Sequence, residues 1–182
     1  TYPEVTAIDT FYTHNYGYLF PPEKLEYGTG YSLVEVSAPY GYTLNSEPVY
    51  FDVTADNATE ENAVTVVEVT KPNMAQKGVI RISKSGEVFS SVTEADSIYQ
   101  PVFAVKGLAG AVYEITAAED IITPDNTLRY AAGEVVDTVT TDETGLAESK
   151  PLYLGKYEVR EITAPTCYVL NTEIHTAELV YA

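Results

Sequence analysis

Apolar and polar residues alternate in short runs along the whole chain. These runs fall at residues 31–36, 49–53, 64–69, 79–84, 111–115, 135–139 and 157–161. A period of two residues is typical of half-buried β-strands, because successive side chains of a strand point to opposite faces. The pattern therefore predicts many short strands in both halves of the chain.

Turn-forming residues separate the predicted strands. Examples are Asn–x–Gly at 15–17, Pro–x–Gly at 39–41 and Asp-Glu-Thr-Gly at 142–145. Thr, Val and the 16 tyrosines suit a pleated surface, and only the short segments 92–96 and 117–120 favour a helix. Many short strands joined by regular turns predict an all-β fold, either a sandwich or a barrel.

The chain also contains an internal repeat. Residues 31–51 read YSLVEVSAPYGYTLNSEPVYF, and residues 157–177 read YEVREITAPTCYVLNTEIHTA. The recurring residues are Tyr31, Glu35, Ala38, Pro39, Tyr42, Leu44, Asn45 and Glu47, which match Tyr157, Glu161, Ala164, Pro165, Tyr168, Leu170, Asn171 and Glu173. A repeat of this length predicts two similar domains, at residues 1–75 and 76–182.

The alignment of the two copies continues upstream. Asp9, Gly17 and Leu25 match Asp137, Gly145 and Leu152. On this alignment residue 1 corresponds to about residue 129, and residue 182 to about residue 56. We therefore expect the first domain to lack its first strands and the second to lack its last strand.

Charge narrows the classes of partner. The formal net charge is −17, with only 10 Lys and Arg residues. Nucleic acids and anionic membranes both require basic patches, so we expect neither as a partner. No run of 18 apolar residues occurs, which predicts no membrane-spanning helix.

Residues with redox or metal chemistry are few. Cys167 is the single cysteine, so no internal disulfide can form. It stands where the first copy has Gly41, which favours a tolerated turn substitution over a reactive thiol. His14 and His175 have no ligand partners at metal-site spacing, so we expect no metal and no cofactor.

Four segments together resemble a known family. They are GVIRISK at 78–84, LAGAVYEI at 108–115, TVTTDETG at 138–145 and GKYEVREITAP at 155–165. They resemble the SpaA/Cna protein B-type domains, which are prealbumin-like β-sandwiches of Gram-positive surface proteins and pilins. The resemblance implies tandem Ig-like or prealbumin-like β-sandwiches in an extracellular protein attached to the cell wall.

The resemblance further implies an intramolecular isopeptide bond. In such domains a first-strand Lys attacks a last-strand Asn or Asp, assisted by the Glu of a Glu-x-x-Ala-Pro motif. Burial favours the neutral amine, which is nucleophilic, and the protonated acid, which polarises the acceptor carbonyl. Packing holds the two groups together and makes the reaction intramolecular.

Carried over residue by residue, the donor is Lys84 and the assisting acids are Glu35 and Glu161. Asn73 is the acceptor candidate of the first domain. The first domain shows no donor and the second shows no acceptor, so a longer chain or a neighbouring subunit would supply them. The alternatives are a solvated strand lysine for Lys84 and a linker turn for Asn73.

Two functions remain open. One is a structural stalk or fibre segment of a surface or pilin-like protein, whose partners are neighbouring tandem domains or identical subunits. The other is an adhesin module that binds a host protein or glycan through exposed aromatic residues. The candidates for that patch are Tyr12, Tyr16, Tyr18, Phe20 and Tyr27. We expect no enzyme that acts on an external substrate.

Overall fold

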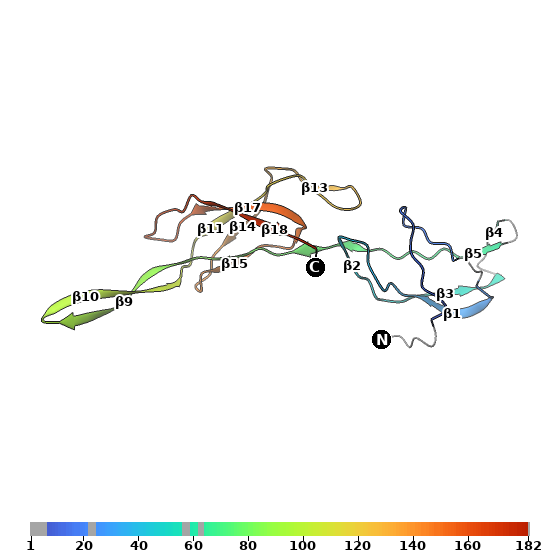
Figure 1. Ribbon diagram of the computed structural model, residues 1–182, viewed down its shortest axis with the longest axis horizontal. Coiled ribbons are helices and arrows are strands. Elements are labelled where there is room, and N and C mark those ends of the chain that lie inside the picture. Colours follow the sequence, from blue (N-terminus) through green and yellow to red (C-terminus); the bar gives the residue numbers. More distant parts are fainter. Residues whose placement is uncertain (1–6, 22–24, 56–58, 62–63, 182) are drawn as a thin grey trace. The chain divides into compact units, whose positions relative to one another are not determined.

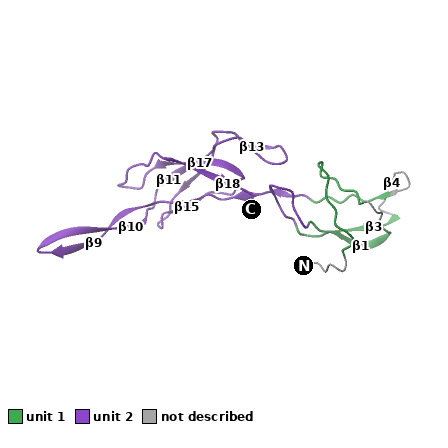
Figure 2. Ribbon diagram, in the orientation of Figure 1, with its two compact units in different colours: residues 1–35, 46–71 green, residues 36–45, 72–182 purple. Residues whose placement is uncertain are grey.

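The computed structural model describes residues 7–21, 25–55, 59–61 and 64–181 (Figure 1). Within these ranges the regular secondary structure is almost entirely strand, and no α-helix is present. The predicted all-β fold is therefore confirmed. The chain separates into two compact units, residues 1–35 with 46–71 and residues 36–45 with 72–182 (Figure 2).

The first unit is built from two antiparallel strand pairs. Strands β1 (Gly28–Leu33) and β3 (Val49–Val53) pair with each other, as do β4 (Thr59–Glu61) and β5 (Val64–Val66). A hydrogen bond of 2.7 Å from the backbone nitrogen of Gly30 to Asp52 Oδ1 links β1 to β3. Tyr31 and Phe51 stack across the same pair, with ring centroids 5.7 Å apart.

The second unit holds the other strands. They are β2 (Tyr42–Thr43), β6 (Met74–Ala75), β7 (Lys77–Gly78), β8 (Arg81–Ser83), β9 (Ser85–Ala95), β10 (Ile98–Gly107), β11 (Val112–Ala117), β12 (Ile121–Ile122), β13 (Leu128–Tyr130), β14 (Val135–Thr140), β15 (Leu146–Glu148), β16 (Leu152–Tyr153), β17 (Gly155–Thr163) and β18 (Ile174–Leu179). Its largest sheet has the order β14-β11-β17-β18, and all its pairings are antiparallel. Shorter pairs are β8 with β15, β7 with β16, β12 with β13 and β2 with β6.

The core of the second unit lies on one face of the four-stranded sheet. In β11 the buried positions alternate with half-buried ones, as the sequence pattern predicts. The opposing layer is formed by the short strands β7, β8, β15 and β16. Ile80, between β7 and β8, and Leu152 of β16 pack with these sheet residues. The buried cluster comprises Ile80, Ala111, Tyr113, Ile115, Ala117, Ile121, Val136, Leu152, Tyr157 and Val159. Two layers with a shared core make this unit a β-sandwich.

The repeated sequence forms repeated local structure. The Tyr157 hydroxyl donates to the Tyr153 carbonyl at 2.5 Å, and the Tyr31 hydroxyl donates to the Glu26 carbonyl at 3.0 Å. After each Ala-Pro the same turn closes: the nitrogen of Tyr168 donates to the carbonyl of Pro165, and the nitrogen of Tyr42 donates to that of Pro39. The repeat in the sequence is thus also a repeat of hydrogen bonds.

The two predicted helical segments are wrong. Residues 92–95 belong to β9, and β11 runs to Ala117 before the chain turns. Helix propensity is a weak preference that neighbouring strands override. In the first segment the antiparallel partner β10 satisfies the backbone in an extended conformation, and in the second only Ala117 is paired, with β17, before residues 118–119 form a bend.

Candidate functional site

Glu161 is a carboxylate inside an otherwise apolar core. In β17 the residues Tyr157, Val159 and Glu161 alternate with exposed neighbours and face the core, and the Glu161 side chain is 1% exposed. Its cross-strand neighbour on β11 is Tyr113. Because a buried carboxylate is rare unless paired or neutralised, this position calls for a specific partner.

Lys84 is that partner. Its Nζ lies 2.9 Å from Glu161 Oε1, and its side chain is 16% exposed. The residue sits between β8 and β9, where its nitrogen donates to the carbonyl of Gly145 at 2.8 Å and its carbonyl accepts from the nitrogen of Leu108 at 3.0 Å. Both backbone groups of Lys84 are therefore held, which aims the side chain into the sandwich.

The two oxygens of Glu161 have different surroundings. Oε2 accepts a hydrogen bond of 2.7 Å from the backbone nitrogen of Asn171. Oε1 is close to the Lys84 ammonium, but its approach is off the hydrogen-bond direction, and no described residue gives it a directed hydrogen bond. The hydrogen bond to Oε2 thus orients the carboxyl group, and Oε1 is available to a hydrogen-bond donor on the side of Lys84.

The charges of this pair act on a neighbouring hydroxyl. Burial raises the pKa of Tyr113, the negative charge of Glu161 raises it further, and the positive charge of Lys84 opposes the rise. Tyr113 therefore stays protonated and adds no charge to the site.

The turn after β14 supports the backbone of Lys84. Asp142 Oδ1 accepts hydrogen bonds from the Thr144 hydroxyl at 2.6 Å, the Thr144 nitrogen at 2.8 Å and the Leu146 nitrogen at 3.0 Å. The Thr144 hydroxyl is the main cause that lowers the pKa of Asp142, followed by the backbone donor of Leu146. Asp142 thereby fixes the turn whose Gly145 carbonyl receives the Lys84 nitrogen.

The predicted partners Glu35 and Asn73 belong to different compact units. Glu35 is half-buried in the first unit. Asn73 lies in the second unit, where its Nδ2 donates to the carbonyl of Thr43 at 3.1 Å. The structure brings Lys84 and Glu161 into contact, but it does not assemble Glu35 and Asn73 within one unit.

The aromatic residues, the cysteine and the histidines singled out in the sequence lie at the surface. The aromatic residues Tyr12, Tyr16, Tyr18, Phe20 and Tyr27 are exposed in the first unit. Cys167 is exposed and has a φ of 71°, close to the 81° of its counterpart Gly41, so its position is a left-handed turn. His14 and His175 belong to no potential metal-binding group among the described residues.

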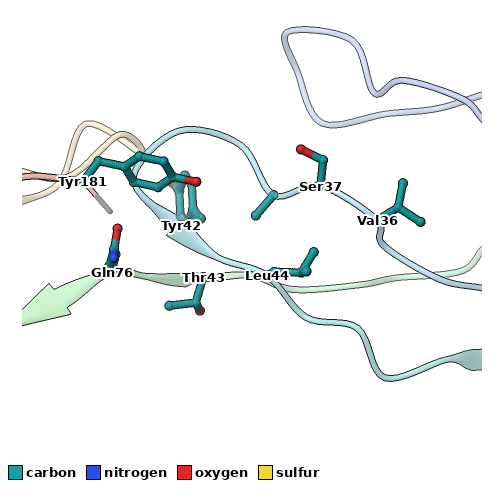
Figure 3. Close-up of a pocket in the computed structure, with 8 residues that line it drawn as sticks. Val36, Ser37, Tyr42, Thr43, Leu44, Gln76 and Tyr181 are labelled. Atoms are coloured by element: carbon teal, nitrogen blue, oxygen red, sulfur yellow. The ribbon is translucent and has the colours of Figure 1, made fainter. Parts of the chain in front are cut away.

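A cavity of about 430 Å³ lies in the second unit beside the first copy of the Ala-Pro turn (Figure 3). It is lined by Val36, Ser37, Ala38, Tyr42, Thr43, Leu44, Gln76 and Tyr181. The buried Oε1 of Gln76 has no hydrogen-bond partner among the described residues. None of the lining residues is an acid, a base or a nucleophile of the Lys84–Glu161 kind, so the cavity has no part in that chemistry.

The fold and the buried pair define a prealbumin-like β-sandwich with a Lys and a Glu in its core. The family model of the SpaA prealbumin-like fold domain matches residues 3–71 and 104–180, and the chain belongs to this family. Membership in this family indicates a structural role of the pilus or surface-protein kind. Residues 72–103 lie outside the match.

Solved structures similar to this chain include the following two. One is the Bacillus anthracis TIE protein, with 25% identity, a TM-score of 0.50, and coverage of 86% of this chain and 23% of that one. The other is the T6 backbone pilin of serotype M6 Streptococcus pyogenes, with 22% identity, a TM-score of 0.31, and coverage of 64% and 20%. The chain thus spans less than a quarter of either protein. No curated protein matches it, and no helix among the described residues is long and apolar enough to cross a membrane.

Proposed function

We propose that the chain is a stalk or fibre segment of a Gram-positive surface or pilus protein, reinforced by a self-formed isopeptide bond at Lys84. The supporting observation is the 2.9 Å contact between Lys84 Nζ and Glu161 Oε1 in the sandwich core. Burial removes the hydration of both charges of an ion pair. A lysine with only a structural role would therefore stabilise the protein no more in the core than at the surface. A lysine that reacts needs this position.

In the proposed reaction Lys84 is the nucleophile and Glu161 is the proton carrier. Transfer of one proton from the ammonium to the carboxylate leaves a neutral amine beside a protonated acid. The amine nitrogen attacks the side-chain carbonyl carbon of an Asn, a C–N bond forms, and the bond to the amide nitrogen breaks. Glu161 gives its proton to the leaving nitrogen, which departs as ammonia, and takes up the second proton, which the attacking amine loses as the new amide forms. An Asp acceptor would release water instead.

The acceptor is an Asn or Asp on a strand that packs beside Lys84 and Glu161. We propose that a further segment of a longer chain, or a neighbouring subunit, supplies it, which makes tandem domains or identical subunits the partners. The family pattern, rather than an observed contact, assigns Glu35 as assisting acid and Asn73 as acceptor in a second proposed bond, with the donor Lys supplied from elsewhere. A covalent bond between strands removes chain entropy from the unfolded state, so it suits a protein under pulling force.

Mass spectrometry tests the bond. The longer parent protein should be lighter than its sequence mass by one ammonia per Lys–Asn bond, or by one water per Lys–Asp bond. Fragmentation should give a branched peptide that contains Lys84. Both Lys84→Met and Glu161→Gln should restore the full mass for this bond, whereas Lys106→Met, a change at a nearby exposed lysine, should keep the loss. A wild-type parent chain with its full mass would overturn the proposal.

A second candidate function is an adhesin module, favoured by the exposed aromatic residues of the first unit. Exposed aromatic side chains are common anchors in protein and glycan recognition. An array of purified host extracellular proteins and glycans should then give a hit that disappears in a Tyr16→Ala, Tyr18→Ala variant. A hit that survives this change would show that the patch is misassigned.

A further inference from the structure

Strands β9 and β10 form a long hairpin with a sheet of its own. They pair antiparallel from Ser85 with Gly107 to Ala95 with Ile98, and no other described strand joins them (Figure 1). The two turn residues, Asp96 and Ser97, both have positive φ, of 52° and 63°. Such turns match the twist of two paired strands, so the hairpin is a preformed element.

The hairpin contributes no residue to the buried core cluster of the sandwich. The family match resumes at residue 104, so all of β9 and much of β10 lie outside it. In the described part of the chain, hydrogen bonds tie the hairpin to the sandwich only at its base: the Tyr168 hydroxyl donates to the carbonyl of Glu87 at 2.7 Å, and the Leu108 nitrogen donates to the carbonyl of Lys84. Every residue from 89 to 101 is exposed. A two-stranded ribbon is marginally stable by itself, so a partner that covers it would stabilise it.

One face of the hairpin is apolar. The register places Phe89 opposite Phe103 and Val92 opposite Pro101, and by alternation Tyr99 and Val105 share this face. We call these six residues the hairpin face. Its five large side chains other than proline are 52 to 70% exposed. Phe89 and Phe103 meet edge to face, with ring centroids 6.3 Å apart, so the centre of the face is already ordered.

Acidic residues border this face. Glu94 is the cross-strand partner of Tyr99, Glu87 is that of Val105, and Asp96 lies at the turn. The sequence has one basic residue between 85 and 107, Lys106, and alternation places it on the opposite face. A second copy of this chain, with a net charge of −17, would bring like charges together. Complementarity therefore favours a basic partner over self-association.

The edges of the hairpin are poorly suited to adding a strand. The register shifts between Val102 and Phe103, which leaves Ser90 as an extra residue on β9. Such bulges increase twist and interrupt edge pairing. Pro101 on β10 has no N–H to offer to a new strand. A partner therefore gains more from covering the face than from pairing along an edge.

We propose that the hairpin face is a docking surface for a protein partner whose contact surface combines apolar side chains with Lys or Arg. The aromatic and aliphatic side chains supply the buried area, and Glu87, Glu94 and Asp96 select the basic groups at the rim. This inference goes beyond the structural role and does not depend on a bond at Lys84.

The test uses a displayed library of random peptides selected on the immobilised full chain. We expect enriched peptides that contain apolar and basic residues together, with affinities that fall as salt rises. A Phe89→Ser, Phe103→Ser variant should bind them at least about tenfold more weakly. The control is Ile98→Ser, an equally exposed apolar residue that alternation places on the opposite face, and it should bind as the wild type does.

A second variant tests the rim separately. Glu87→Lys with Glu94→Lys should lose the basic peptides while circular dichroism and the thermal midpoint stay unchanged. The proposal is overturned if no peptide is enriched, if the enriched peptides lack basic residues, or if they bind the Phe89→Ser, Phe103→Ser variant equally well. It is also overturned if sedimentation shows Phe89-dependent self-association, or if the chain binds phosphatidylcholine vesicles through this face.

Discussion

Gly145 and Lys84 approach each other so closely that only a glycine fits between their backbones. The Lys84 nitrogen donates to the Gly145 carbonyl at 2.8 Å, and a β-carbon on Gly145 would lie 2.2 Å from the Lys84 carbonyl oxygen. Gly145 also has a φ of 80°, a region that side chains other than glycine adopt at a cost. The placement of Lys84, the candidate nucleophile, thus depends on a glycine in the turn that follows β14.

This relationship predicts that Gly145→Ala destabilises the second unit strongly. The positive φ costs about 1–2 kcal/mol, and the clash with the Lys84 carbonyl adds to it. The matched control is Gly17→Ala, because Gly17 is the repeat counterpart, has a φ of 79° and has open space where a β-carbon would go. Calorimetry should show a clearly larger fall in thermal midpoint for Gly145→Ala. Equal shifts would mean that the close contact is not important.

The buried ion pair predicts non-additive changes in the free energy of unfolding. Lys84→Met or Glu161→Gln alone leaves an unpaired group in the core, which costs about 3–5 kcal/mol for a buried pair. The double variant should lose clearly less than the sum of the two single losses. Urea unfolding of all four proteins measures this coupling. Glu148→Gln, which breaks the exposed pair with Arg81, should change stability little. Additive losses would show that the two core residues are not coupled.

The lowered pKa of Asp142 leads us to expect that the folded protein loses stability in acid. Its pKa in the folded protein is lowered from the ordinary value of 3.8 because it accepts hydrogen bonds from Thr144 and Leu146. A carboxyl with a lowered pKa stabilises the fold fully above its unfolded value, and this contribution is lost as the pH falls through the folded value.

Asp142→Asn should therefore be less stable at neutral pH and should lose less stability than the wild type as the pH falls below about 4. Thermal midpoints measured across this pH range provide the comparison. Glu143→Gln removes one charge from the same turn without removing these hydrogen bonds, so it should follow the wild-type profile. A profile of Asp142→Asn parallel to that of the wild type would contradict the role of Asp142.

The repeated tyrosine hydrogen bond predicts unequal effects of the same substitution. Tyr157→Phe removes the donor to the Tyr153 carbonyl and should cost about 1 kcal/mol, because Tyr157 is fully buried and its hydrogen bond is partly shielded from water. Tyr31→Phe should cost less, since Tyr31 is only half-buried and water can replace the hydroxyl. Hydrogen exchange in each unit measures both changes. A larger loss for Tyr31→Phe would overturn the assignment of Tyr157 as the core tyrosine.

Much of the second unit could be predicted from the sequence because local patterns agree with the fold. The alternation in 111–115 and 157–161 predicts β11 and β17, and the structure has both strands. Glu-x-x-Ala-Pro and the strand that ends at Lys84 indicated the candidate residues through the family resemblance. Their 2.9 Å contact could not be predicted from spacing, since 77 positions separate residues 84 and 161.

The β9–β10 hairpin was missed for a physical reason. The segment 92–96 has the composition of a helix turn, and the decisive interaction is its pairing with residues 98–101 across a two-residue turn. No Asn-Gly or Asp-Gly marks that turn, because Asp96 and Ser97 adopt positive φ without glycine. Propensity alone therefore indicated the wrong element.

The sequence by itself determined the all-β class, the repeat and the types of residue available for cross-linking, because period-two patterns and turn residues act locally. Only the tertiary structure decided which face of β17 is buried, and with it that Glu161 points into the core. It also decided that Lys84 meets Glu161 and that Phe89 and Phe103 remain exposed. These outcomes depend on which strands pair and which faces pack together, and a pattern along one strand is the same whichever face the neighbouring layer covers.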